Sequence, residues 1–572
     1  MNTFQQQTIH TKGIYLPWGL LMKNIKIILG QINPVVADIN YNLEKIIKII
    51  QDHQDVDVII FPEMGLVGYP LMDHILDPLV QKKNRDAIEQ IKSINSRATI
   101  IVGTFTQPPE LSGSFQPFYN SAVVINGKKI IHIENKRLLP NYDVFDEHRY
   151  FSFDKKFKPI EINGIKAGIL ICEDVWDDAY DIKVTHNLVS NNAEILIVIN
   201  ASPYHINKIK MRHDLIQKKS KLFSIPIVYL NMVGGLDEIV YDGQSFVTNK
   251  LAQVIYQAKA FEEDVAEVEI NIDDDKPIEF PPPMLDWREE VIGALKLNVY
   301  DYYHKSGVFK GIVLGLSGGI DSAFTAYICA KAIGSDKITC IMMPTRFTSD
   351  QSINLARDLC ENLEIKYIIH PIDDIFQSYN QDFKKNLGEL PFDIADENLQ
   401  ARIRATILMY YSNKFNWLLV STGNKSEIAV GYCTLYGDTC GGKNIPGDLL
   451  KIQIYDICNW INREKEVIPK GIIERPPTAE LRENQKDEDS LPPYSILDLI
   501  LNEIIKHGIG NELDHLKKKG VDLETINHVR KLYLNSEFKR RQLVQSIKVS
   551  ESAFGIGRRY PVLKKINFDN EF

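Results

Sequence analysis

The chain has 572 residues, a net charge of -9 and a pI near 5.9, with 44% hydrophobic and 25% charged residues. These values are typical of a globular, soluble protein of two or more domains, and they argue against a nucleic-acid-binding surface as its main feature. Seven cysteines without a Cys-x-x-Cys pair indicate neither a disulfide framework nor a zinc site, which favours a reducing cytoplasm. No apolar run approaches the roughly 18 residues of a membrane span.

The first half of the chain alternates short apolar runs with helical stretches. Residues 1–21 are expected to be a flexible extension or to lie upstream of a true start at Met22, and they lack the features of a signal peptide. From there, runs such as NIKIILGQI, ATIIVGTF and AEILIVINAS are typical of strands, whereas NYNLEKIIKIIQDH has helical spacing. The pattern predicts a layered α/β domain over residues 22–272.

A break in this pattern separates the two halves. Residues 273–287 lie in an acidic, proline-rich run, NIDDDKPIEFPPPMLD, that has no periodicity and predicts a linker. In residues 288–572, helical segments separate four apolar runs, which are FKGIVLGLSGG, KITCIMMPT, EIKYIIHPI and NWLLVSTGN. Such crossovers predict a doubly wound parallel sheet, with ligands at the carboxyl ends of its strands.

The segment GLSGGIDS follows the first of these strands and precedes a helix. The amides of residues 317–320 can converge at the helix N-terminus, where the helix dipole favours an anion. The glycines permit close approach of a phosphate, and Asp321 among these donors suits a metal that bridges phosphates. A plain strand-to-helix turn is the alternative. No lysine follows the glycines, so the segment is not the GxxxxGK[ST] loop.

The loop resembles that of the N-type ATP pyrophosphatases, which cleave ATP between the α and β phosphates and adenylate a carbonyl oxygen. This resemblance explains the missing lysine, because the γ-phosphoryl group is not transferred. Four motifs follow the loop in order, and they are ENLQARIR, LLVSTGNKSEIAVGYCTLYGDTCGGKNIPGDLLK, ERPPTAELRENQKDEDSLPPY and SEFKRRQ. Together they resemble the NAD synthetases, whose catalytic domain is doubly wound and similar to the adenine nucleotide alpha hydrolases.

The resemblance implies roles for individual residues. ATP binding is implied for Gly315, Leu316, Ser317, Gly318, Gly319, Ile320, Asp321, Ser322, Thr422, Lys451 and Thr478. Binding of deamido-NAD is implied for Asn398, Arg402, Glu427 and Lys539. Asp321 and Glu427 would hold the Mg²⁺ that accompanies ATP, and no tightly bound organic cofactor is expected. Asn398 and Arg402 could instead form a solvated helix face, and Lys539 could belong to an ordinary basic run.

One residue departs from part of that family. Leu435 stands before YGD, where members that use only ammonia tend to carry lysine. The glutamine-using branch shares this kind of change, so we interpret it as specific to that branch.

The first half carries a candidate nucleophile, Cys172, where the strand of GILICEDVW ends. A thiol there could simply pack in the core. However, Glu63 ends another strand and Lys136 begins a further motif, NKRLLPNYDVFDEHRYF. The Glu, Lys, Cys order resembles the nitrilase superfamily, which folds as an α-β-β-α sandwich.

The chemistry of that superfamily explains these residue types. A free thiol has a pKa of about 8.5, so Glu63 would act as the general base and return the proton to leaving ammonia. Lys136 would stabilise the oxyanion, and Glu147 would orient Lys136 or the hydrolytic water. Resemblance to glutamine-using NAD synthetases implies a glutamine site formed by Tyr142, Glu173, Ser202 and Lys208. Glu173 would bind the α-amino group of glutamine or make a structural hydrogen bond beneath the nucleophile.

The resemblance covers nearly the whole chain beyond residue 22. It implies ATP- and glutamine-dependent amidation of deamido-NAD to NAD, with AMP, pyrophosphate and glutamate as the other products. A sealed path for ammonia is expected, together with a homo-oligomer built on a synthetase dimer and only small-molecule substrates, without nucleic acid or membrane.

Three alternatives remain open at this point. The nearest is another glutamine-dependent N-type ATP pyrophosphatase, which would share only SGGxDS with this chain. A non-catalytic nucleotide-binding protein is disfavoured because Cys172, Asp321 and Glu427 are all present. The third is a nitrilase with an appended binding module.

Overall fold

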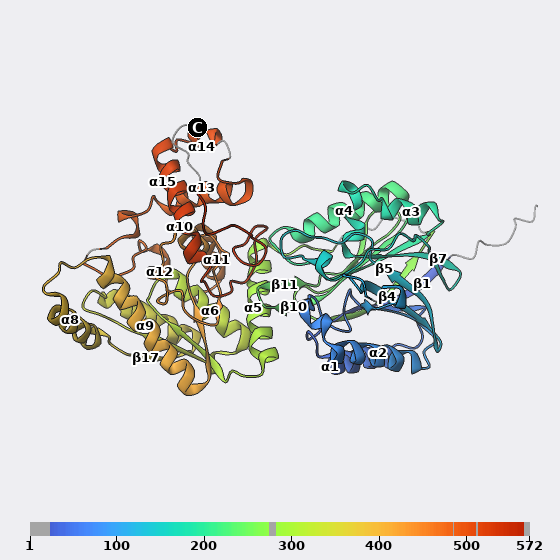
Figure 1. The fold of residues 1–572 in the computed structure, drawn as a ribbon, viewed down its shortest axis with the longest axis horizontal. Helices are drawn as coiled ribbons and strands as arrows, with labels where there is room; N and C mark the ends of the chain where they lie inside the picture. Colours follow the sequence, from blue (N-terminus) through green and yellow to red (C-terminus); the bar gives the residue numbers. More distant parts are fainter. Residues whose placement is uncertain (1–22, 112, 274–281, 484, 511–512, 566–572) are drawn as a thin grey trace, which may run out of the picture.

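The computed structural model describes residues 23–565, apart from 112, 274–281, 484 and 511–512. The chain forms two lobes, and helix α5 (Trp287–Ser306) lies between them (Figure 1). The predicted extension, 1–21, lies outside the described residues, as does most of the predicted linker, 273–287. In the described ranges, no helix combines the length and the apolar character needed to cross a membrane.

The first lobe contains two six-stranded sheets. One sheet has the strand order β14-β1-β2-β3-β4-β5, with bounds Asp264–Asn271, Asn24–Gln31, Val58–Ile60, Thr99–Thr106, Tyr119–Asn126 and Lys129–Asn135. The other has the order β13-β12-β9-β8-β7-β6, with bounds Val254–Gln257, Phe246–Thr248, Ile227–Asn231, Ile195–Asn200, Ile165–Ile171 and Ile160–Ile162. Among the described residues, the α-helices of this lobe are α1 (Ile39–Asp52), α2 (Pro78–Ser93), α3 (Val184–Ser190) and α4 (Lys208–Phe223).

Both faces of the inner strands are buried, which explains why strands such as β1, β3 and β8 are largely apolar. On β1, Ile25 and Ile27 pack against the opposite sheet, whereas Ile28 packs in the cluster that contains α1 and α2. A second outer cluster joins the other sheet to α3 and α4. Because successive strand residues point to opposite faces, one strand serves both layers. The predicted α-β-β-α sandwich is confirmed.

The second lobe is built on a five-stranded parallel sheet with the order β17-β16-β15-β18-β19. The strand bounds are Lys366–Ile369, Ile338–Met342, Gly311–Gly315, Trp417–Ser421 and Lys443–Asn444. Helices α8 (Asp373–Leu387) and α9 (Ile394–Phe415) pack on one face. The other face carries α5, α6 (Ile320–Ile333), α7 (Asp350–Leu363) and α11 (Lys451–Ile461). Helices on both faces confirm the predicted doubly wound sheet, and its strand order reverses at β15.

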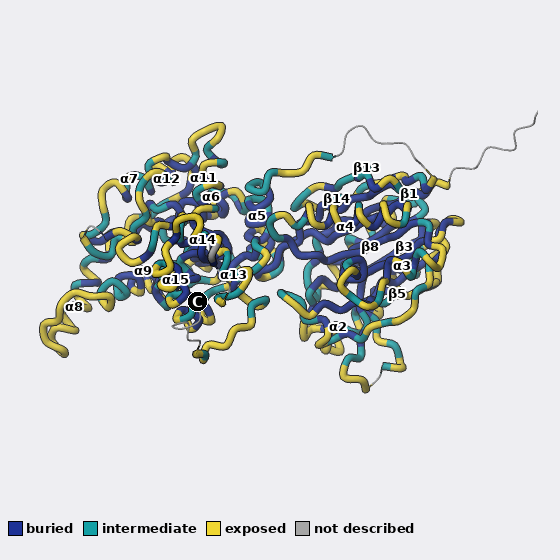
Figure 2. Tube along the Cα trace, turned by 90° about the horizontal axis from the view of Figure 1, so that it is seen from above, coloured by how far each residue is buried: buried dark blue, intermediate teal, exposed yellow. Residues whose placement is uncertain are grey.

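A helical layer covers the end of this lobe. Its helices are α10 (Lys425–Val430), α12 (Lys470–Glu474), α13 (Tyr494–His507), α14 (Asp514–Lys518), α15 (Leu523–Asn535) and α16 (Glu537–Arg540). Most of them share one apolar cluster, separate from that of the sheet. Figure 2 shows buried chain through the centre of each lobe and a largely exposed α8 at the far end of the second lobe.

The lobes also meet through a short hairpin, β10 (Val233–Leu236) and β11 (Ile239–Asp242). This hairpin packs on α5, and Val240 belongs to the apolar core of the second lobe. The Asn298 side chain donates to the carbonyl oxygens of Asp237 and Ile239 at distances of 3.0 and 3.1 Å. The contact between the lobes is therefore partly apolar and hydrogen-bonded.

Candidate active sites

Cys172 lies at the carboxyl end of β7, where a single 3-10 turn (Cys172–Val175) begins. Its φ is 47°, a left-handed conformation that is uncommon for residues other than glycine and that marks functional turns. The thiol is buried, and burial raises its pKa well above the ordinary value. The charge of Glu63 raises this pKa further, whereas the charge of Lys136 lowers it. The sequence-predicted nucleophile, base and cation therefore lie within electrostatic reach of one another.

Glu63 and Lys136 form a buried ion pair beside this turn. The Lys136 ammonium donates to Oε1 of Glu63 at 2.7 Å and to Oε1 of Glu147 at 2.8 Å. Glu63 also accepts hydrogen bonds from the Asn120 side chain at 2.7 Å and from the Ala201 amide at 2.8 Å. These bonds hold the Glu63 carboxylate in one orientation. The Lys136 ammonium therefore lies between the carboxylates of Glu63 and Glu147.

Glu147 is the second carboxylate of this centre. Burial raises its pKa to about 7, although the charge of Lys136 opposes that effect. The Tyr69 hydroxyl also donates to Oε1 of Glu147, at 2.8 Å. Within the described part of the chain, Glu147 Oε2, Asn120 Oδ1 and the Tyr241 hydroxyl are buried without a hydrogen-bond partner. Buried polar atoms are normally paired, so these groups are available to a small polar ligand.

The backbone beneath Glu63 requires glycine at position 103, on β3. A Cβ added to Gly103 would lie 2.1 Å from the carbonyl oxygen of Pro62 and 2.7 Å from Cα of Glu63. No side chain fits at these distances. The position of the base therefore depends on a residue that carries no functional group.

The four predicted glutamine-binding residues surround the same turn. The Tyr142 hydroxyl donates to both Glu173 oxygens at 3.1 and 3.0 Å, and the Tyr180 hydroxyl donates at 2.9 Å. Lys208 begins α4, and its Nζ lies 4.4 Å from the centre of the Trp176 ring. Burial lowers the pKa of Lys208 to about 8. Ser202 is buried next to the bidentate Arg212–Asp242 ion pair.

The second site forms around the GLSGGIDS loop. Gly318 has a φ of 79°, and a Cβ there would lie 2.4 Å from the carbonyl oxygen of Ser352. The Ser322 hydroxyl donates to the Gly319 carbonyl at 3.0 Å and accepts from the Ser317 amide at 3.3 Å. These bonds fix a tight turn at the N-terminus of α6, the geometry that binds phosphates.

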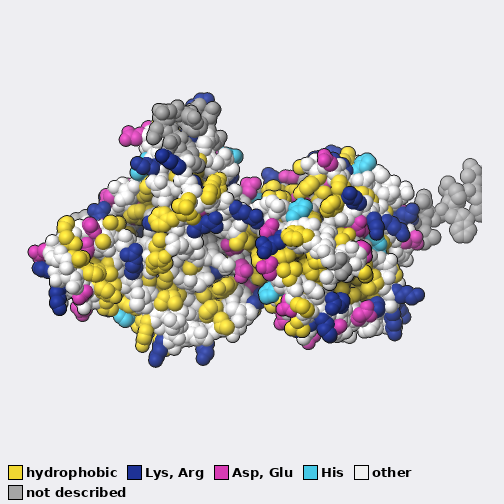
Figure 3. Space-filling model, in the orientation of Figure 1, with side chains coloured by type: hydrophobic (Ala, Val, Ile, Leu, Met, Phe, Trp, Pro, Cys, Tyr) yellow, Lys and Arg dark blue, Asp and Glu magenta, His cyan; other side chains and the backbone are white. Residues whose placement is uncertain are grey.

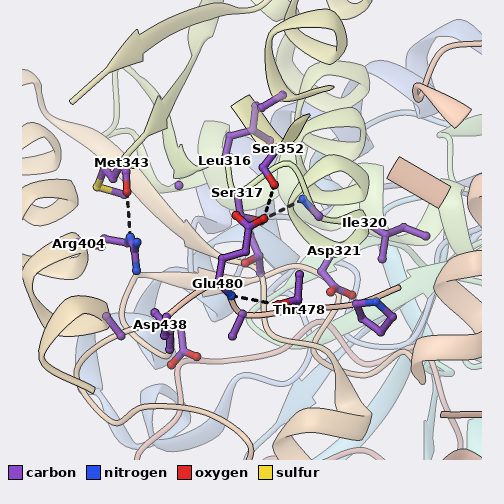
Figure 4. Close-up of a pocket in the computed structure, with 18 of the residues that line it drawn as sticks. Leu316, Ser317, Ile320, Asp321, Met343, Ser352, Arg404, Asp438, Thr478 and Glu480 are labelled. Carbon is purple, nitrogen blue, oxygen red and sulfur yellow. Dashed lines mark hydrogen bonds between the residues drawn. The ribbon is translucent and has the colours of Figure 1, made fainter. Parts of the chain in front are cut away.

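A cavity of about 310 Å³ adjoins the loop (Figure 4). It contacts predicted ATP-site residues, namely Gly315, Leu316, Ser317, Gly319, Ile320, Asp321, Thr422, Lys451 and Thr478. Glu427 also lines it. The structure thus brings these residues together at the carboxyl ends of β15 and β18.

Asp321 and Glu427 meet at one cation. The ammonium of Lys451 lies 2.5 Å from Oδ2 of Asp321 and 3.3 Å from Oε1 of Glu427. Asn424 caps α10 and donates to Asp321 at 3.1 Å, which links the two carboxylates through α10. Burial raises the pKa of Glu427 to about 8, and the charge of Lys451 opposes this rise.

This pair fits a Mg²⁺ ion that accompanies ATP. Mg²⁺ prefers oxygen ligands and usually keeps several waters, with one or two carboxylates and phosphates completing its shell. The two carboxylates already converge on a positive charge. The described residues contain no cluster of three or more His, Cys, Asp or Glu ligands, so phosphate oxygens and water would supply the remaining ligands.

Three predicted dinucleotide contacts instead form hydrogen bonds to the 431–438 segment. The Asn398 side chain accepts from the Thr434 hydroxyl at 2.7 Å, and Arg402 donates to the Leu435 carbonyl at 3.2 Å. Lys539 donates to the carbonyl oxygens of Gly431 and Cys433 at 2.7 Å each. These three residues support the segment that carries YGD.

Sequence reasoning missed five charged residues of the cavity: Arg404, Asp438, Arg475, Glu480 and Asp487, of which Figure 4 labels Arg404, Asp438 and Glu480. Arg404 donates to the Met343 carbonyl at 3.1 Å, and burial lowers its pKa to about 10. Glu480 accepts from the hydroxyls of Ser349 and Ser352 at 2.9 and 2.6 Å. All five lie inside motifs quoted above, which was the available signal, but spacing alone does not tell which motif residue faces the cavity.

Comparison with known proteins agrees with both halves of the chain. Residues 26–277 match the carbon-nitrogen hydrolase family and residues 291–543 match the NAD synthase family. The glutamine-dependent NAD(+) synthetase of Acinetobacter baylyi is 40% identical over 547 residues, which cover 95% of this chain and 99% of that protein. The enzyme of the same name from Synechocystis sp. is 39% identical over 551 residues, with coverage of 94% and 98%.

A solved structure extends the similarity to the fold. The structure of glutamine-dependent NAD+ synthetase from Acinetobacter baumannii in complex with ADP superimposes with a TM-score of 0.75 and 36% identity, covering 94% of this chain and 98% of that one. Fold, sites and matched families define a two-domain enzyme in which a carbon-nitrogen hydrolase is fused to an NAD synthase. The chain belongs to the family of glutamine-dependent NAD(+) synthetases.

Proposed function

We propose that the two sites divide the amidation of deamido-NAD to NAD, a reaction that consumes ATP and glutamine. The first lobe releases ammonia from glutamine, and the second activates the nicotinate carboxylate and transfers the ammonia to it. One observation carries the proposal: a single chain holds both a buried Cys172–Glu63–Lys136 centre and a phosphate-type loop with converging carboxylates. Another N-type pyrophosphatase amidotransferase is not favoured, because the family similarity spans both lobes.

In the first lobe, Glu63 takes the proton of Cys172 as the sulfur attacks the glutamine amide carbon. Lys136 stabilises the oxyanion, and Glu63 then returns the proton to the leaving ammonia. Water activated by Glu63 hydrolyses the thioester and releases glutamate. Lys208 binds the glutamine carboxylate, while Tyr142 and Ser202 shape the pocket and Glu173 receives the α-amino group.

In the second lobe, the amides of the GLSGGIDS loop bind the phosphates of ATP and retain pyrophosphate after adenylation. Mg²⁺ would be held by Asp321 and Glu427, where it would neutralise phosphate charge. Thr422, Lys451 and Thr478 complete the ATP site. Asn398, Arg402, Glu427 and Lys539 bind deamido-NAD, three of them from positions around the 431–438 segment.

Ammonia must travel between the lobes without protonation, because ammonium is not a nucleophile. A hollow of about 240 Å³ lies between the lobes, and Tyr69 and Tyr241 form part of its wall. Tyr69 donates to Glu147, and burial together with the charges of Glu63 and Cys172 raises the pKa of Tyr241. The two tyrosines therefore stand between the catalytic carboxylates and the hollow. This arrangement supports the hollow as the first part of the ammonia path.

The proposal also includes a homo-oligomer that forms through a surface of the second lobe. Hydrophobic side chains gather on the exposed side of the second lobe, over α8 and α9 (Figure 3). They include Tyr379, Phe383, Leu387, Ile394, Tyr410 and Phe415, each at least 44% exposed. Exposed apolar patches of this kind mark interfaces between proteins. The double variant Tyr410→Glu/Phe415→Glu should lower the mass measured by sedimentation velocity, and a monomeric wild type would contradict the proposed homo-oligomer.

The seven unpaired thiols support a cytoplasmic location.

The decisive assay supplies purified protein with deamido-NAD, Mg-ATP and either glutamine or ammonium, and measures NAD, AMP and pyrophosphate. We expect NAD from both nitrogen sources, with one AMP and one pyrophosphate for each NAD. No NAD from either source would overturn the proposal. Phosphate and ADP in place of pyrophosphate and AMP would overturn the adenylation step.

A further inference from the structure

A segment from the C-terminal end of the second lobe, residues 546–558, crosses to the first lobe. The Val549 carbonyl accepts from the Ile206 amide at 2.9 Å, and the Lys548 amide donates to the Glu238 carbonyl at 2.7 Å. Ile206 lies two residues before Lys208 of the proposed glutamine site. The crossing segment therefore contacts the first lobe next to that site.

Lys548 makes the charged contact of this crossing. Its side chain is 3% exposed, and its ammonium lies 3.1 Å from Oδ2 of Asp143. It also donates to the carbonyl oxygens of Ser550 and Glu551 at 2.8 and 2.9 Å. Two carbonyls within its own segment therefore aim the Lys548 ammonium across the boundary at one carboxylate.

Asp143 follows Tyr142 in a strained turn. Its φ is 49°, and the Phe145 amide donates to the Tyr142 carbonyl at 2.9 Å to close the turn. A left-handed residue other than glycine persists where the surroundings fix it. Gly557 supplies a second constraint, because a Cβ there would lie 2.4 Å from Oδ1 of Asp143. The Lys548 ion pair and the close approach of Gly557 both constrain this turn, and both residues belong to the second lobe.

The turn at Asp143 also fixes the position of Tyr142 at the glutamine site. The Tyr142 ring packs edge-on against Phe145 at 5.5 Å, and its hydroxyl reaches Glu173 next to Cys172. Tyr142 is 54% exposed, so packing in its own lobe does not by itself hold it. The ion pair to Lys548 acts one residue away from this side chain.

The crossing segment is anchored directly after Lys548. Asp448 is fully buried and accepts hydrogen bonds from the amides of Val549 and Ser550 at 2.8 and 2.7 Å. The ammonium of Lys425 lies 2.7 Å from the same carboxylate. Lys548 therefore projects from a fixed backbone, which is what a positioning contact requires.

We infer that Lys548 of the second lobe is a positioning residue of the glutamine site, acting through Asp143 to hold Tyr142 over Cys172 and Glu173. The inference rests on the proposed function, because it assigns a role within the glutamine half-reaction. A lysine far along the chain thus completes a site built otherwise by the first lobe. A simple interdomain contact would instead stabilise the chain and leave glutamine binding unchanged.

The test uses steady-state kinetics of the full-length protein with glutamine and, separately, with ammonium. Asp143→Asn preserves shape and removes the partner charge, and we expect it to raise the KM for glutamine about five- to tenfold. Lys548→Met should do the same, Lys548→Arg should restore much of the loss, and the double variant should be no worse than either single variant. Ammonium-driven synthesis and the melting temperature of Asp143→Asn should match those of the wild type.

Arg559→Ala is the matched control. Arg559 belongs to the same C-terminal region and faces Asp146 of the same loop, but that pair is 3.7 Å apart and its side chains are 65% and 43% exposed. Solvent screens such a pair, so its loss should leave the KM unchanged. An unchanged glutamine KM in Asp143→Asn overturns the inference, as does an equal loss with ammonium. A wild type that cannot use glutamine would instead overturn the proposed function.

Discussion

The ammonium of Lys136 lies 2.7 Å from Oε1 of Glu63, and both side chains are at most 1% exposed. These residues lie 73 positions apart in the chain, and burial keeps their charges away from bulk solvent. Glu147 shares the same ammonium from the other side. Burial raises the pKa of Cys172, so the thiol needs a base to take its proton, the step that the proposed reaction assigns to Glu63.

Replacing Lys136 by methionine should lower both stability and glutamine use. Removing one member of a buried ion pair typically costs about 3–5 kcal/mol, since the remaining charges lose their partner. We expect a lower melting temperature for the first lobe and no glutamine-driven NAD. Glu147→Gln is the milder comparison, because the Glu63 pair survives. A Lys136→Met protein with wild-type stability would show that the carboxylates take up protons instead.

Cys172→Ala should abolish NAD synthesis from glutamine and preserve synthesis from ammonium. The substitution removes the nucleophile but leaves the second lobe intact, and alanine fits where the thiol is buried. Both rates are measured on the same preparation with deamido-NAD and Mg-ATP. Loss of the ammonium reaction as well would mean that the two sites are not separate in function.

Gly103→Ala should impair glutamine use although no functional group changes. A methyl group at this position would overlap the Pro62 carbonyl, so the backbone of Glu63 must shift. A misplaced catalytic base can reduce a rate by about two orders of magnitude. The ammonium reaction is the internal control. Unchanged kcat/KM for glutamine would show that the backbone of β3 shifts to accommodate the methyl group while Glu63 stays in place.

The kcat/KM for glutamine should fall as pH rises through about 8, the pKa of Lys208. Burial lowers this pKa, so Lys208 is charged below pH 8 and neutral above it, where it no longer attracts the glutamine carboxylate. The limiting fall is about tenfold per pH unit. Lys208→Arg stays charged and should remove this limb of the profile. A profile identical in both proteins would assign the titration to another group.

Asp321→Asn should abolish NAD formation from either nitrogen source while leaving Cys172 competent to form a thioester. The change removes one of the two carboxylates that converge on the Lys451 ammonium, and we expect NAD synthesis to fall at least about a hundredfold. Labelling of Cys172 by a glutamine analogue reports on the first site. Asp358→Asn, an exposed carboxylate on α7, is the control. NAD synthesis reduced less than tenfold would contradict the proposed metal site.

Local patterns predicted a layered α/β first domain and a doubly wound second one, whereas the α-β-β-α sandwich was implied by the resemblance to the nitrilase superfamily. A strand that is buried on both faces has apolar residues at nearly every position. Continuous apolar runs such as AEILIVINAS therefore predict buried strands. The edge strand β14 was not predicted, because Asp264–Asn271 alternates polar and apolar residues and its pairing with β1 joins segments about 240 residues apart. Such pairing depends on topology, which single-sequence periodicity does not contain.

The sequence by itself determined the chemistry that is encoded in contiguous motifs. The GLSGGIDS loop and the strand-end positions of Cys172 and Glu63 could be read from neighbouring residues, because turns and strand ends are local structures. Only the tertiary structure decided that Lys451 lies between Asp321 and Glu427 and that Lys548 reaches Asp143 in the other lobe. Those contacts arise when whole elements pack, and the distances between side chains far apart in the chain are fixed by that packing alone.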